Sequence, residues 1–539
     1  MKKFLALLTV CALILGSLAG CGGDSGTPDQ GGAGDTGGVA ANSDITILDY
    51  AEMSSLYPLD MGTVSDAQPM FWIYDPLLRL DPNQEYVWML ATGCDTNDEG
   101  TEYTFHLREG ISFSDGTPWN AEAAKANLDI MADQSHGYKS QFMYANIDRT
   151  EIVDEYTVKV YLKEVYAPFL NALAIEPAGM VSPKLLEAGD EALNTTPIGT
   201  GQYTMKERRV GEYCLYELNR DWWGYDADIC GGTPLVDADC GFNTITLRPV
   251  SEEATRVAML MSGEANIINS LTHTNKATVE AAGKETLQKV GTSMAYFYLN
   301  CQKDVFKDVR VRQAISMAID IDALNDVVYG GEYEKASSFL TGSINFYQPQ
   351  TPYEYNIEKA KQLLTDAGYG DGLTLVCWEE NDTTDIQRGE FIQQQLEKVG
   401  ITLKIYPQEG GFLTDNVNAY SGDPKDTAFD CYIRGYGADT ADPDEAVGRF
   451  ASKALPPMGG NYSFYKNPEF DKAIEAGARS IDSDVRAEAY ATAQKIIWDD
   501  VPAVALLSTC YSAAYDSHID GLQFGPAGCF NLMKAKYVE

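Results

Sequence analysis

Residues 373–406 read LTLVCWEENDTTDIQRGEFIQQQLEKVGITLKIY. Two runs in this stretch, residues 373–378 and 401–406, have the composition of short strands. Between them, residues 386–399 have the spacing of a helix, and Gly400 provides a stop signal. A strand, a helix and a strand in succession predict an α/β lobe.

Regular secondary structure is expected on both sides of this stretch. Upstream, the turn-rich residues 97–100 precede an alternating run at 102–107, which predicts a hairpin. Asn120 is a suitable N-cap for a following helix. Downstream, residues 467–500 predict a long helical region with a break at 480–483, followed by an apolar run that predicts a strand.

Length and charge limit the possible classes of protein. The chain has 539 residues and a formal net charge of -39. This length exceeds the size at which one hydrophobic core stops growing, so we expect two or three lobes. The negative charge should repel nucleic acid and anionic lipid, and we expect no nucleic-acid partner. Solubility is the simplest reason for the acidity, and steering of cationic ligands is the alternative.

The N-terminus has the pattern of an export signal. Lys2 and Lys3 precede an apolar run, residues 4–19, that is too short to span a ~30 Å hydrocarbon core comfortably. The run ends in Leu-Ala-Gly-Cys, and residues 18–21 resemble the lipobox of bacterial lipoproteins. The alternative is an ordinary signal peptide with a chance cysteine.

This pattern predicts how the chain is processed. We expect residues 1–20 to be removed as a signal peptide and Cys21 to carry the lipid. Residues 21–43 are rich in glycine and contain no aromatic residue, so they should form a flexible tether. The remainder of the chain should lie outside the membrane.

The usual motifs of catalysis and metal binding are missing. The four histidines are isolated, and the sequence contains no Cys-x-x-Cys, G-x-S-x-G or P-loop pattern. The paired carboxylates of a glycosidase stay an alternative. With 79 acidic residues in the chain, two neighbouring carboxylates do not by themselves indicate such a site. We expect no enzyme, no metal site and no cofactor.

Nine cysteines follow Cys21, an odd number that leaves at least one free thiol in an exported chain. Cys230 and Cys240 flank glycines and a proline in a loop-like stretch. They are the best candidates for a bridge, although spacing alone does not establish one.

Five motifs, in order along the chain, resemble those of one protein family. The longest is EYTFHLREGISFSDGTP at residues 102–118. The others lie at residues 309–320, 358–369, 395–401 and 467–471. Together they are similar to the solute-binding proteins of peptide-type ABC importers, the oligopeptide- and dipeptide-binding class known as extracellular solute-binding protein family 5.

The resemblance implies a two-lobed α/β fold of the hinge-bending periplasmic-binding-protein kind, with an inserted third domain. By this resemblance, lobe I comprises residues 44–84, 198–293 and 506–539. The inserted domain II comprises residues 85–197, and lobe II, also called domain III, comprises residues 294–505. Ligand would bind between the lobes, which close by a hinge motion.

The resemblance also implies a ligand-binding segment, RGYGADTADP at residues 434–443. In peptide-binding members, the matching aspartate binds the α-ammonium group of the peptide and the preceding strand pairs with the peptide backbone. These roles would fall to Asp439 and to the strand near Gly435 and Gly437. On a purely structural interpretation, Asp439 caps a turn.

Further site residues follow from the same resemblance. Tyr436 stands where the family often has tryptophan and would form an aromatic wall. Arg434 would bind a carboxylate, although it lies one residue from the arginine of some members. Arg388 lies about two positions from an arginine that dipeptide binders use. Gly62 and Thr63 match a loop of lobe I that touches the peptide backbone.

The implied function is that of a binding protein that captures peptides and delivers them to ABC permease and ATPase subunits. We expect a monomer that faces the outside of the cell membrane, at the extracellular surface or in the periplasm, and is attached through its lipid only. Members of this family also bind nickel chelates, haem, glutathione or oligosaccharides, and these ligands are alternatives. Few histidines count against metal, and Asp439 counts against sugars. A surface sensor or adhesin is the other alternative, and the sequence leaves ligand identity and peptide length open.

Overall fold

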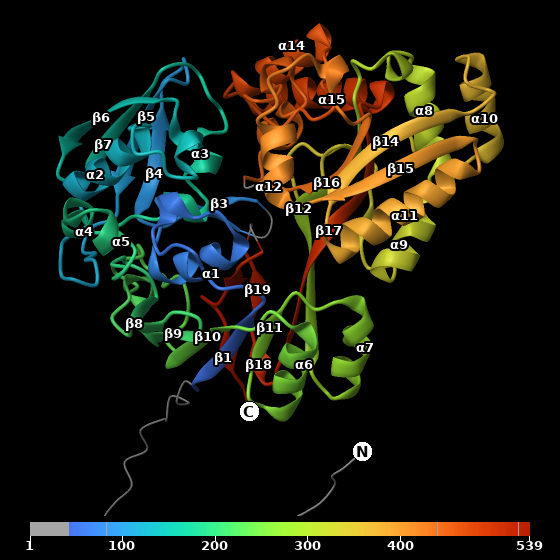
Figure 1. Cartoon of the computed structure of the whole chain (residues 1–539). Coiled ribbons are helices and arrows are strands. Elements are labelled where there is room, and N and C mark those ends of the chain that lie inside the picture. The colour runs from blue at the N-terminus through green and yellow to red at the C-terminus, as the bar shows by residue number, and fades with distance from the viewer. Residues whose placement is uncertain (1–42, 82–83, 439, 526–527, 539) are drawn as a thin grey trace, which may run out of the picture. The chain divides into compact units, whose positions relative to one another are not determined.

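The computed structural model describes residues 43–81, 84–438, 440–525 and 528–538. Cys21, most of the expected tether and Asp439 therefore lie outside the described residues. Residues 41–539 belong to one compact unit. Helices and strands alternate along this unit (Figure 1). No helix in the described ranges is long and apolar enough to cross a membrane.

An 11-stranded sheet runs through the unit. Its two longest strands, β12 (Glu285–Leu299) and β17 (Ala503–Tyr515), are antiparallel neighbours near its middle. On one side of this pair the sheet continues through β16 (Cys431–Tyr436), β14 (Leu373–Glu380) and β15 (Ile401–Gln408). On the other side it continues through β11 (Ile267–Asn269), β1 (Ile45–Asp49), β10 (Thr244–Pro249), β9 (Tyr213–Leu218) and β8 (Tyr203–Arg209), and the short β13 (Glu334–Lys335) pairs with β17.

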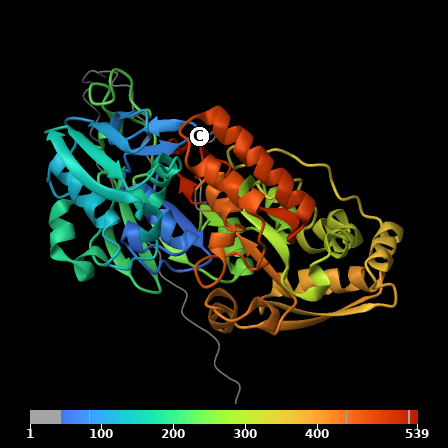
Figure 2. The ribbon, with the colours of Figure 1, turned by 90° about the horizontal axis from the view of Figure 1, so that it is seen from above.

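The hydrophobic cores divide along the same line. The largest core takes its residues from positions 45–267 and 513–535, and two further cores take theirs from positions 294–507. Figure 2 shows most of the blue-to-green elements in one half of the unit and most of the yellow-to-orange elements in the other. From here on, lobe I means the first half together with the inserted residues 85–197, and lobe II means the second half; the residue boundaries of the domains stay a prediction.

Residues 373–406 fold as the sequence predicts. β14 and β15 are parallel neighbours, with Leu373 opposite Ile401, and helix α11 (Thr383–Glu397) connects them. The helix begins three residues earlier than expected, because the Asp382 carboxylate accepts the backbone N–H groups of Thr384 and Asp385.

The hairpin prediction is also confirmed. A four-stranded sheet consists of β4 (Ala91–Thr96), β5 (Glu102–Leu107), β7 (Thr157–Leu162) and β6 (Ile147–Asp154), in this order. The Asn97 side chain closes the β4–β5 turn by accepting the N–H groups of Thr101 and Glu102. Helix α2 (Ala121–Ala132) follows its N-cap Asn120.

The other helices cover the sheets. The predicted region 467–500 divides at residues 479–482 into α14 (Pro468–Ala478) and α15 (Ser483–Asp500). Lobe I also contains α1 (Val64–Ile73), α3 (Phe169–Ala172), α4 (Pro183–Ala188), α5 (Asp190–Leu193), α6 (Glu253–Ser262) and α7 (His273–Ala281). Lobe II also contains α8 (Val309–Ala318), α9 (Ile321–Tyr329), α10 (Ile357–Asp366), α12 (Gly410–Leu413) and α13 (Pro443–Gly448). The short paired strands are β2 (Leu78–Leu80) with β3 (Tyr86–Trp88), β18 (Ile519–Asp520) with β21 (Lys536–Tyr537), and β19 (Gln523–Phe524) with β20 (Phe530–Asn531).

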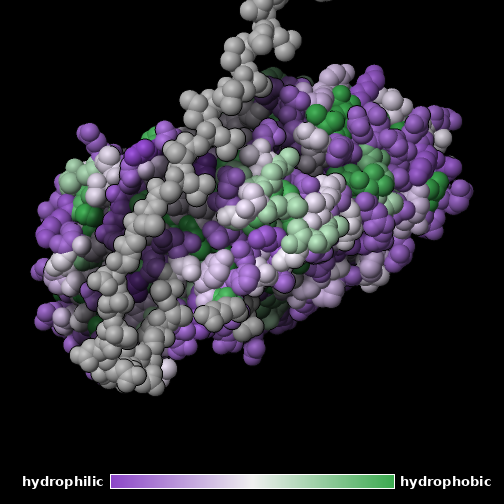
Figure 3. Space-filling model, turned by 90° about the horizontal axis from the view of Figure 1, so that it is seen from below, coloured by the Kyte–Doolittle hydropathy of each residue, from purple (hydrophilic) through white to green (hydrophobic). Residues whose placement is uncertain are grey.

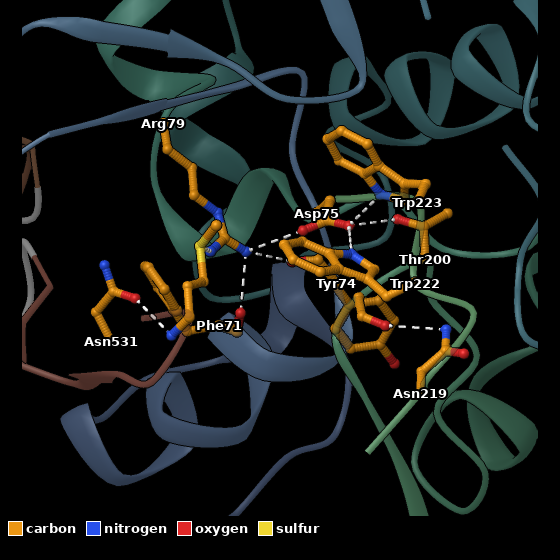
Figure 4. A network of polar contacts seen from close by, with 11 residues as sticks. Phe71, Tyr74, Asp75, Arg79, Thr200, Asn219, Trp222, Trp223 and Asn531 are labelled. Atoms are coloured by element: carbon orange, nitrogen blue, oxygen red, sulfur yellow. Dashed lines mark hydrogen bonds and ion pairs between the residues drawn. The ribbon is translucent and has the colours of Figure 1, made fainter. Parts of the chain in front are cut away.

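A buried polar network joins the segments before and after the four-stranded sheet (Figure 4). The carboxylate of Asp75, which is 2% exposed, accepts hydrogen bonds from Oγ1 of Thr200 at 3.0 Å and Nε1 of Trp223 at 2.9 Å. Nε1 of Trp222 at 3.3 Å and Nη2 of Arg79 at 3.4 Å complete the set. Because a buried carboxylate without donors is costly, this network fixes the segments to each other.

Every cysteine in the described ranges is a free thiol. The suggested bridge between Cys230 and Cys240 is therefore wrong for this structure. Each thiol has its own local acceptor, since Cys230 Sγ donates to the carbonyl of Trp223 at 3.5 Å and Cys240 Sγ contacts the Asp239 carboxylate at 4.0 Å.

The molecular face shown in Figure 3 is largely hydrophilic, with hydrophobic residues in small groups. This distribution agrees with the acidic composition of the chain.

Candidate ligand cleft

A cavity of about 610 Å³ lies beside the central strands β12 and β17 and is lined by both lobes. Lobe I contributes Tyr50, Val64, residues 269–274, Tyr511 and Phe524, among others. Lobe II contributes Val328, Tyr329, Glu332, Tyr333, Thr383, Thr384 and Gln387. Aromatic, hydroxyl and amide side chains dominate this lining. Such a lining, in a hollow between two lobes, is typical of a small-molecule site.

The sequence-predicted residues Gly62 and Thr63 lie at the lobe I wall, directly before Val64. Thr63 is the N-cap of α1 and forms a capping box with Asp66. Oδ2 of Asp66 accepts the N–H groups of Gly62 at 2.9 Å and Thr63 at 3.0 Å. These two donors are therefore occupied, and the carbonyl oxygen of Thr63 already accepts the N–H groups of Asp66 at 3.1 Å and Ala67 at 3.2 Å. Contact with a ligand backbone is left to the carbonyl oxygen of Gly62.

The electrostatics of Asp66 agree with this role. Burial opposes ionisation of its carboxyl group, but the N–H groups of Gly62, Ser54 and Ser55 outweigh burial and lower the pKa. Asp66 is therefore a structural anion that holds the loop before α1.

Stacked tyrosines form part of the lobe II wall. The rings of Tyr329 and Tyr333 lie 4.3 Å apart, centroid to centroid. Burial raises the pKa of Tyr333 to about 12, so its hydroxyl group is neutral at physiological pH. Both rings offer apolar surface with a hydroxyl group.

A buried charged group lies directly behind this wall. Arg388 is 4% exposed, pairs with Asp385, and donates from Nη1 to the Tyr329 hydroxyl at 3.3 Å. Glu379 is 1% exposed, and burial raises its pKa to about 8 against the opposing effect of Arg388. The Glu379 carboxyl group fills the space beside Gly389, so a side chain in place of the glycine would collide with it. Arg388 is thus engaged by groups of its own lobe.

Three carboxylates near this wall, those of Glu380, Asp382 and Asp385, have oxygens within 4.8 Å of one another. Asp382 already caps α11, and Asp385 pairs with Arg388. Their existing partners explain the cluster without a metal ion.

The predicted ligand segment lies at the end of β16. Arg434 and Gly435 belong to this strand and lie opposite Tyr296 and Ala295 of β12. On its other edge β16 pairs with β14 only as far as Ile433. The edges of Arg434 and Gly435 that face away from β12 are therefore not paired with any described strand.

Two arginine side chains, one of them from this segment, contact tyrosine side chains here. Arg434 donates from Nη1 to the hydroxyl of Tyr432 at 3.2 Å and lies 5.9 Å from the ring centroid of Tyr462. The guanidinium group of Arg449 covers the ring of Tyr436. Nε and Nη1 of Arg449 are buried and have no hydrogen-bond acceptor among the described residues. No motif in the sequence distinguishes Arg449 as a site residue.

The turn after β16 is fixed on both sides of position 439. Oγ1 of Thr292 donates to the carbonyl oxygen of Ala438 at 2.5 Å. The N–H and hydroxyl groups of Thr440 both donate to Glu445, at 2.8 and 2.9 Å. Gly437 lies against Ser293, where a Cβ atom would collide with the serine hydroxyl group. These contacts place the turn beside the strands that join the lobes.

Comparisons with known proteins identify this architecture. The family described as bacterial extracellular solute-binding proteins, family 5 Middle, matches residues 85–455. The chain belongs to this family. A curated relative, the glutathione-binding protein GsiB of Salmonella typhi, is 30% identical over 496 residues, covering 91% of this chain and 94% of the relative.

Solved structures of family 5 proteins have the same fold. The chain is similar to the ABC transporter-associated periplasmic binding protein DppA of Helicobacter pylori, solved with the peptide STSA, with a TM-score of 0.74 and 25% identity over 92% of this chain and 98% of that one. It is also similar to HbpA2 of Haemophilus parasuis, with a TM-score of 0.80 and 23% identity over 92% of this chain and all of that one. The expectation of a two-lobed periplasmic-binding-protein fold is confirmed.

In this family 5 protein, none of the predicted residues 434–438 lines the cavity, and from the loop before α1 only the following Val64 does. The lobe II wall, with Tyr329, Tyr333 and Thr383, was not predicted from the sequence. One signal for that wall was present: polar residues 381–384 follow the carboxyl end of β14, and ligands of α/β sheets bind at such ends.

Proposed function

We propose that this protein is the substrate-binding component of an ABC importer and that it captures peptides between lobes I and II. The observation that carries the proposal is the cavity of about 610 Å³ that both lobes line beside the strands joining them. A site divided between two lobes closes when the lobes approach each other, which couples binding to a change of shape that a transporter can recognise.

Backbone pairing is the mode of recognition that we propose. The unpaired edges of Arg434 and Gly435 accept an extended peptide as an added strand, which makes binding nearly independent of the peptide's side chains. Asp439 binds the α-ammonium group, Tyr436 supplies an aromatic wall, and Arg434 binds a carboxylate.

The remaining predicted site residues have smaller roles in this proposal. Gly437 keeps the turn close to Ser293, and the loop at Gly62 and Thr63 contacts the peptide from lobe I through the carbonyl oxygen of Gly62. The H. pylori protein, whose structure contains a bound peptide, supports this choice of ligand.

Glutathione is the second candidate, because the chain is 30% identical to a protein named as glutathione-binding. Glutathione has an ammonium group and two carboxylates, so the same segment would bind it, with Arg434 on one carboxylate. Nickel chelates, haem and oligosaccharides are weaker candidates, since no observation at the cleft favours them.

The location and partners of the protein complete the proposal. A lipid on Cys21 anchors it to the cell membrane after the signal peptide is removed, and residues 22–43 tether the body outside. It acts as a monomer with an ABC permease and ATPase, and it catalyses no reaction. An organism that lacks a partner permease would instead favour a surface sensor or adhesin.

Two measurements test the ligand. Native mass spectrometry of gently purified protein gives the mass of any retained cargo. Calorimetry on protein stripped of cargo then compares a pool of short peptides, the same pool after N-acetylation, and reduced glutathione. Tight binding of the free pool with loss on N-acetylation supports peptide capture, and binding of glutathione alone selects the second candidate. Binding of none of these probes overturns the proposal.

A further inference from the structure

The two lobes also contact each other directly through elements outside the central strands. Nδ2 of Asn171, in α3 of lobe I, donates to Oδ2 of Asp442 in lobe II at 3.1 Å. The N–H group of Ala167 donates to the carbonyl oxygen of Ala478 at 2.8 Å. An ion pair between Arg479 and Glu164, at 2.9 Å, lies nearby but is exposed.

Asp442 is the centre of this contact. It is 1% exposed and is the N-cap of α13, since Oδ1 accepts the N–H group of Asp444 at 3.0 Å. Its Oδ2 accepts from Asn171 and also from Nη2 of Arg486 at 2.6 Å. The Asp442 carboxylate therefore caps α13, forms an ion pair within lobe II and accepts a hydrogen bond from lobe I.

Asn171 is held in place from its other side. It is 2% exposed, and its Oδ1 accepts the hydroxyl group of Tyr86, in β3 of lobe I. Both halves of the amide are thus used, which fixes its orientation toward Asp442.

Asp442 lies six residues after the end of β16 and directly before α13. The turn is fixed to β12 through Thr292 and Ala438, and to α13 through Thr440 and Glu445. Asn171 adds an anchor from the opposite lobe. This last anchor is present only when the lobes are in contact.

We propose that Asn171 is a positioning residue: through Asp442 it stabilises the arrangement in which the two lobes are in contact, which we call the closed arrangement, and adds an anchor to the segment that directly precedes α13. This inference rests on the proposed function for the role of the turn in ligand binding. Asn171 acts through Asp442 and needs no contact with the ligand.

The contact is suited to repeated opening. Separation of the lobes leaves Asp442 paired with Arg486, because both belong to lobe II. Asn171, Ala167 and Gln84, which donates to the carbonyl oxygen of Ser343, exchange a protein acceptor for water. The partly exposed Lys276–Glu332 pair and the exposed Arg479–Glu164 pair add little. No buried charge is left without a partner, so opening avoids the large penalty of an isolated ion.

The test replaces Asn171 by leucine, which has a similar shape and no donor. Small-angle scattering on cargo-free protein measures the radius of gyration, a readout that avoids thiol labels where the described residues include nine free cysteines. Asn171→Leu should lower the ratio of closed to open protein about tenfold or more, because it removes a hydrogen bond to a charged group. The radius of gyration should rise, and affinity for the short-peptide pool should fall to a similar degree.

Asn127→Leu is the matched control. Asn127 is also buried, but both of its Nδ2 hydrogen bonds, to Ala123 and Val181, stay within lobe I. This control should lower thermal stability without changing the radius of gyration of the folded protein. Should Asn171→Leu fail to fold, Asn171→Ser serves as the second variant.

The outcomes separate the two proposals. A larger radius of gyration for the Asn171 variant, in a protein that binds no peptide, supports the positioning role and rejects the ligand assignment. An unchanged radius of gyration together with unchanged peptide affinity overturns the positioning role, whichever ligand binds. Equal expansion of the Asn127 control also overturns it.

Discussion

The hydroxyl group of Thr292 donates a hydrogen bond to the carbonyl oxygen of Ala438 at 2.5 Å. Thr292 lies in the register break of β12 between Val290 and Met294, within the pair of strands that joins the lobes. Ala438 directly precedes position 439. One buried hydrogen bond therefore connects the joint between the lobes to the turn that we propose binds the ligand.

Thr292→Val should weaken peptide binding about tenfold, because it removes this donor and leaves the Ala438 carbonyl without it. Calorimetry with the short-peptide pool measures the change. Thr509→Val is the matched control, since Oγ1 of Thr509 donates to Ser293 in the same joint at 3.1 Å but does not reach the turn. Equal losses for the two variants would contradict the specific role of Thr292.

Asp439→Ala should weaken peptide binding by roughly a hundredfold or more, because a buried ammonium group would lose its partner, at about 3 to 5 kcal/mol. N-acetylation of the peptides should do comparable damage to the wild type. Asp426→Ala, at an exposed position of the same lobe, is the control and should bind normally. Equal affinity for free and N-acetylated peptides would refute the assignment of Asp439.

Glu379→Gln should remove a pH-dependent loss of stability. Burial raises the pKa of Glu379 from 4.5 to about 8, so the folded state holds a proton that the unfolded state releases. Its contribution to stability is complete below pH 4.5 and is lost as the pH rises to about 8. The free energy of unfolding of the variant, relative to that of the wild type, should therefore increase by on the order of 3 kcal/mol between pH 4.5 and pH 8.5.

Denaturant midpoints measured across this pH range give the difference between the two proteins. Glu380→Gln, at the next residue and partly exposed, is the control and should show the wild-type pH profile. A profile for Glu379→Gln that runs parallel to the wild type would show that Glu379 is ionised in the folded protein.

Asp75→Asn should destabilise lobe I by about 2 to 4 kcal/mol, because the amide group brings its own donors to a site that already has four. The thermal midpoint should fall, and tryptophan emission should shift to longer wavelength at lower denaturant concentration, since Trp222 and Trp223 are partners of Asp75. The exposed Asp221→Asn should change stability by less than about 0.5 kcal/mol. Similar midpoints for the two variants would show that the network contributes little.

Cys21→Ser should give a folded protein that is no longer anchored, because the lipid rather than the body attaches it to the membrane. Fractionation of cells after a salt wash measures the distribution. Ligand affinity of the released protein should equal that of the anchored form. Retention of the variant in the membrane fraction would contradict lipid anchoring at Cys21.

Local patterns were enough to predict much of the secondary structure. The strand, helix and strand at 373–406, the hairpin at 97–107 and the break near residue 480 all follow from periodicity, turn residues and stop signals within short windows. The start of α11 was placed too late, because its N-cap Asp382 stands before any apolar residue of the helix.

The sequence by itself determined the order of helices and strands, the family motifs and the segment at 434–443, because each is encoded by neighbouring residues. The tertiary structure alone decided which distant residues meet. Thr292 and Ala438 are 146 positions apart, and Asn171 and Asp442 are 271 apart. No local periodicity encodes such pairs, since they arise only when two cores formed from separate parts of the chain come together. For the same reason the stacked wall of Tyr329 and Tyr333, and the buried pair of Arg388 and Asp385 behind it, became visible only in the folded chain.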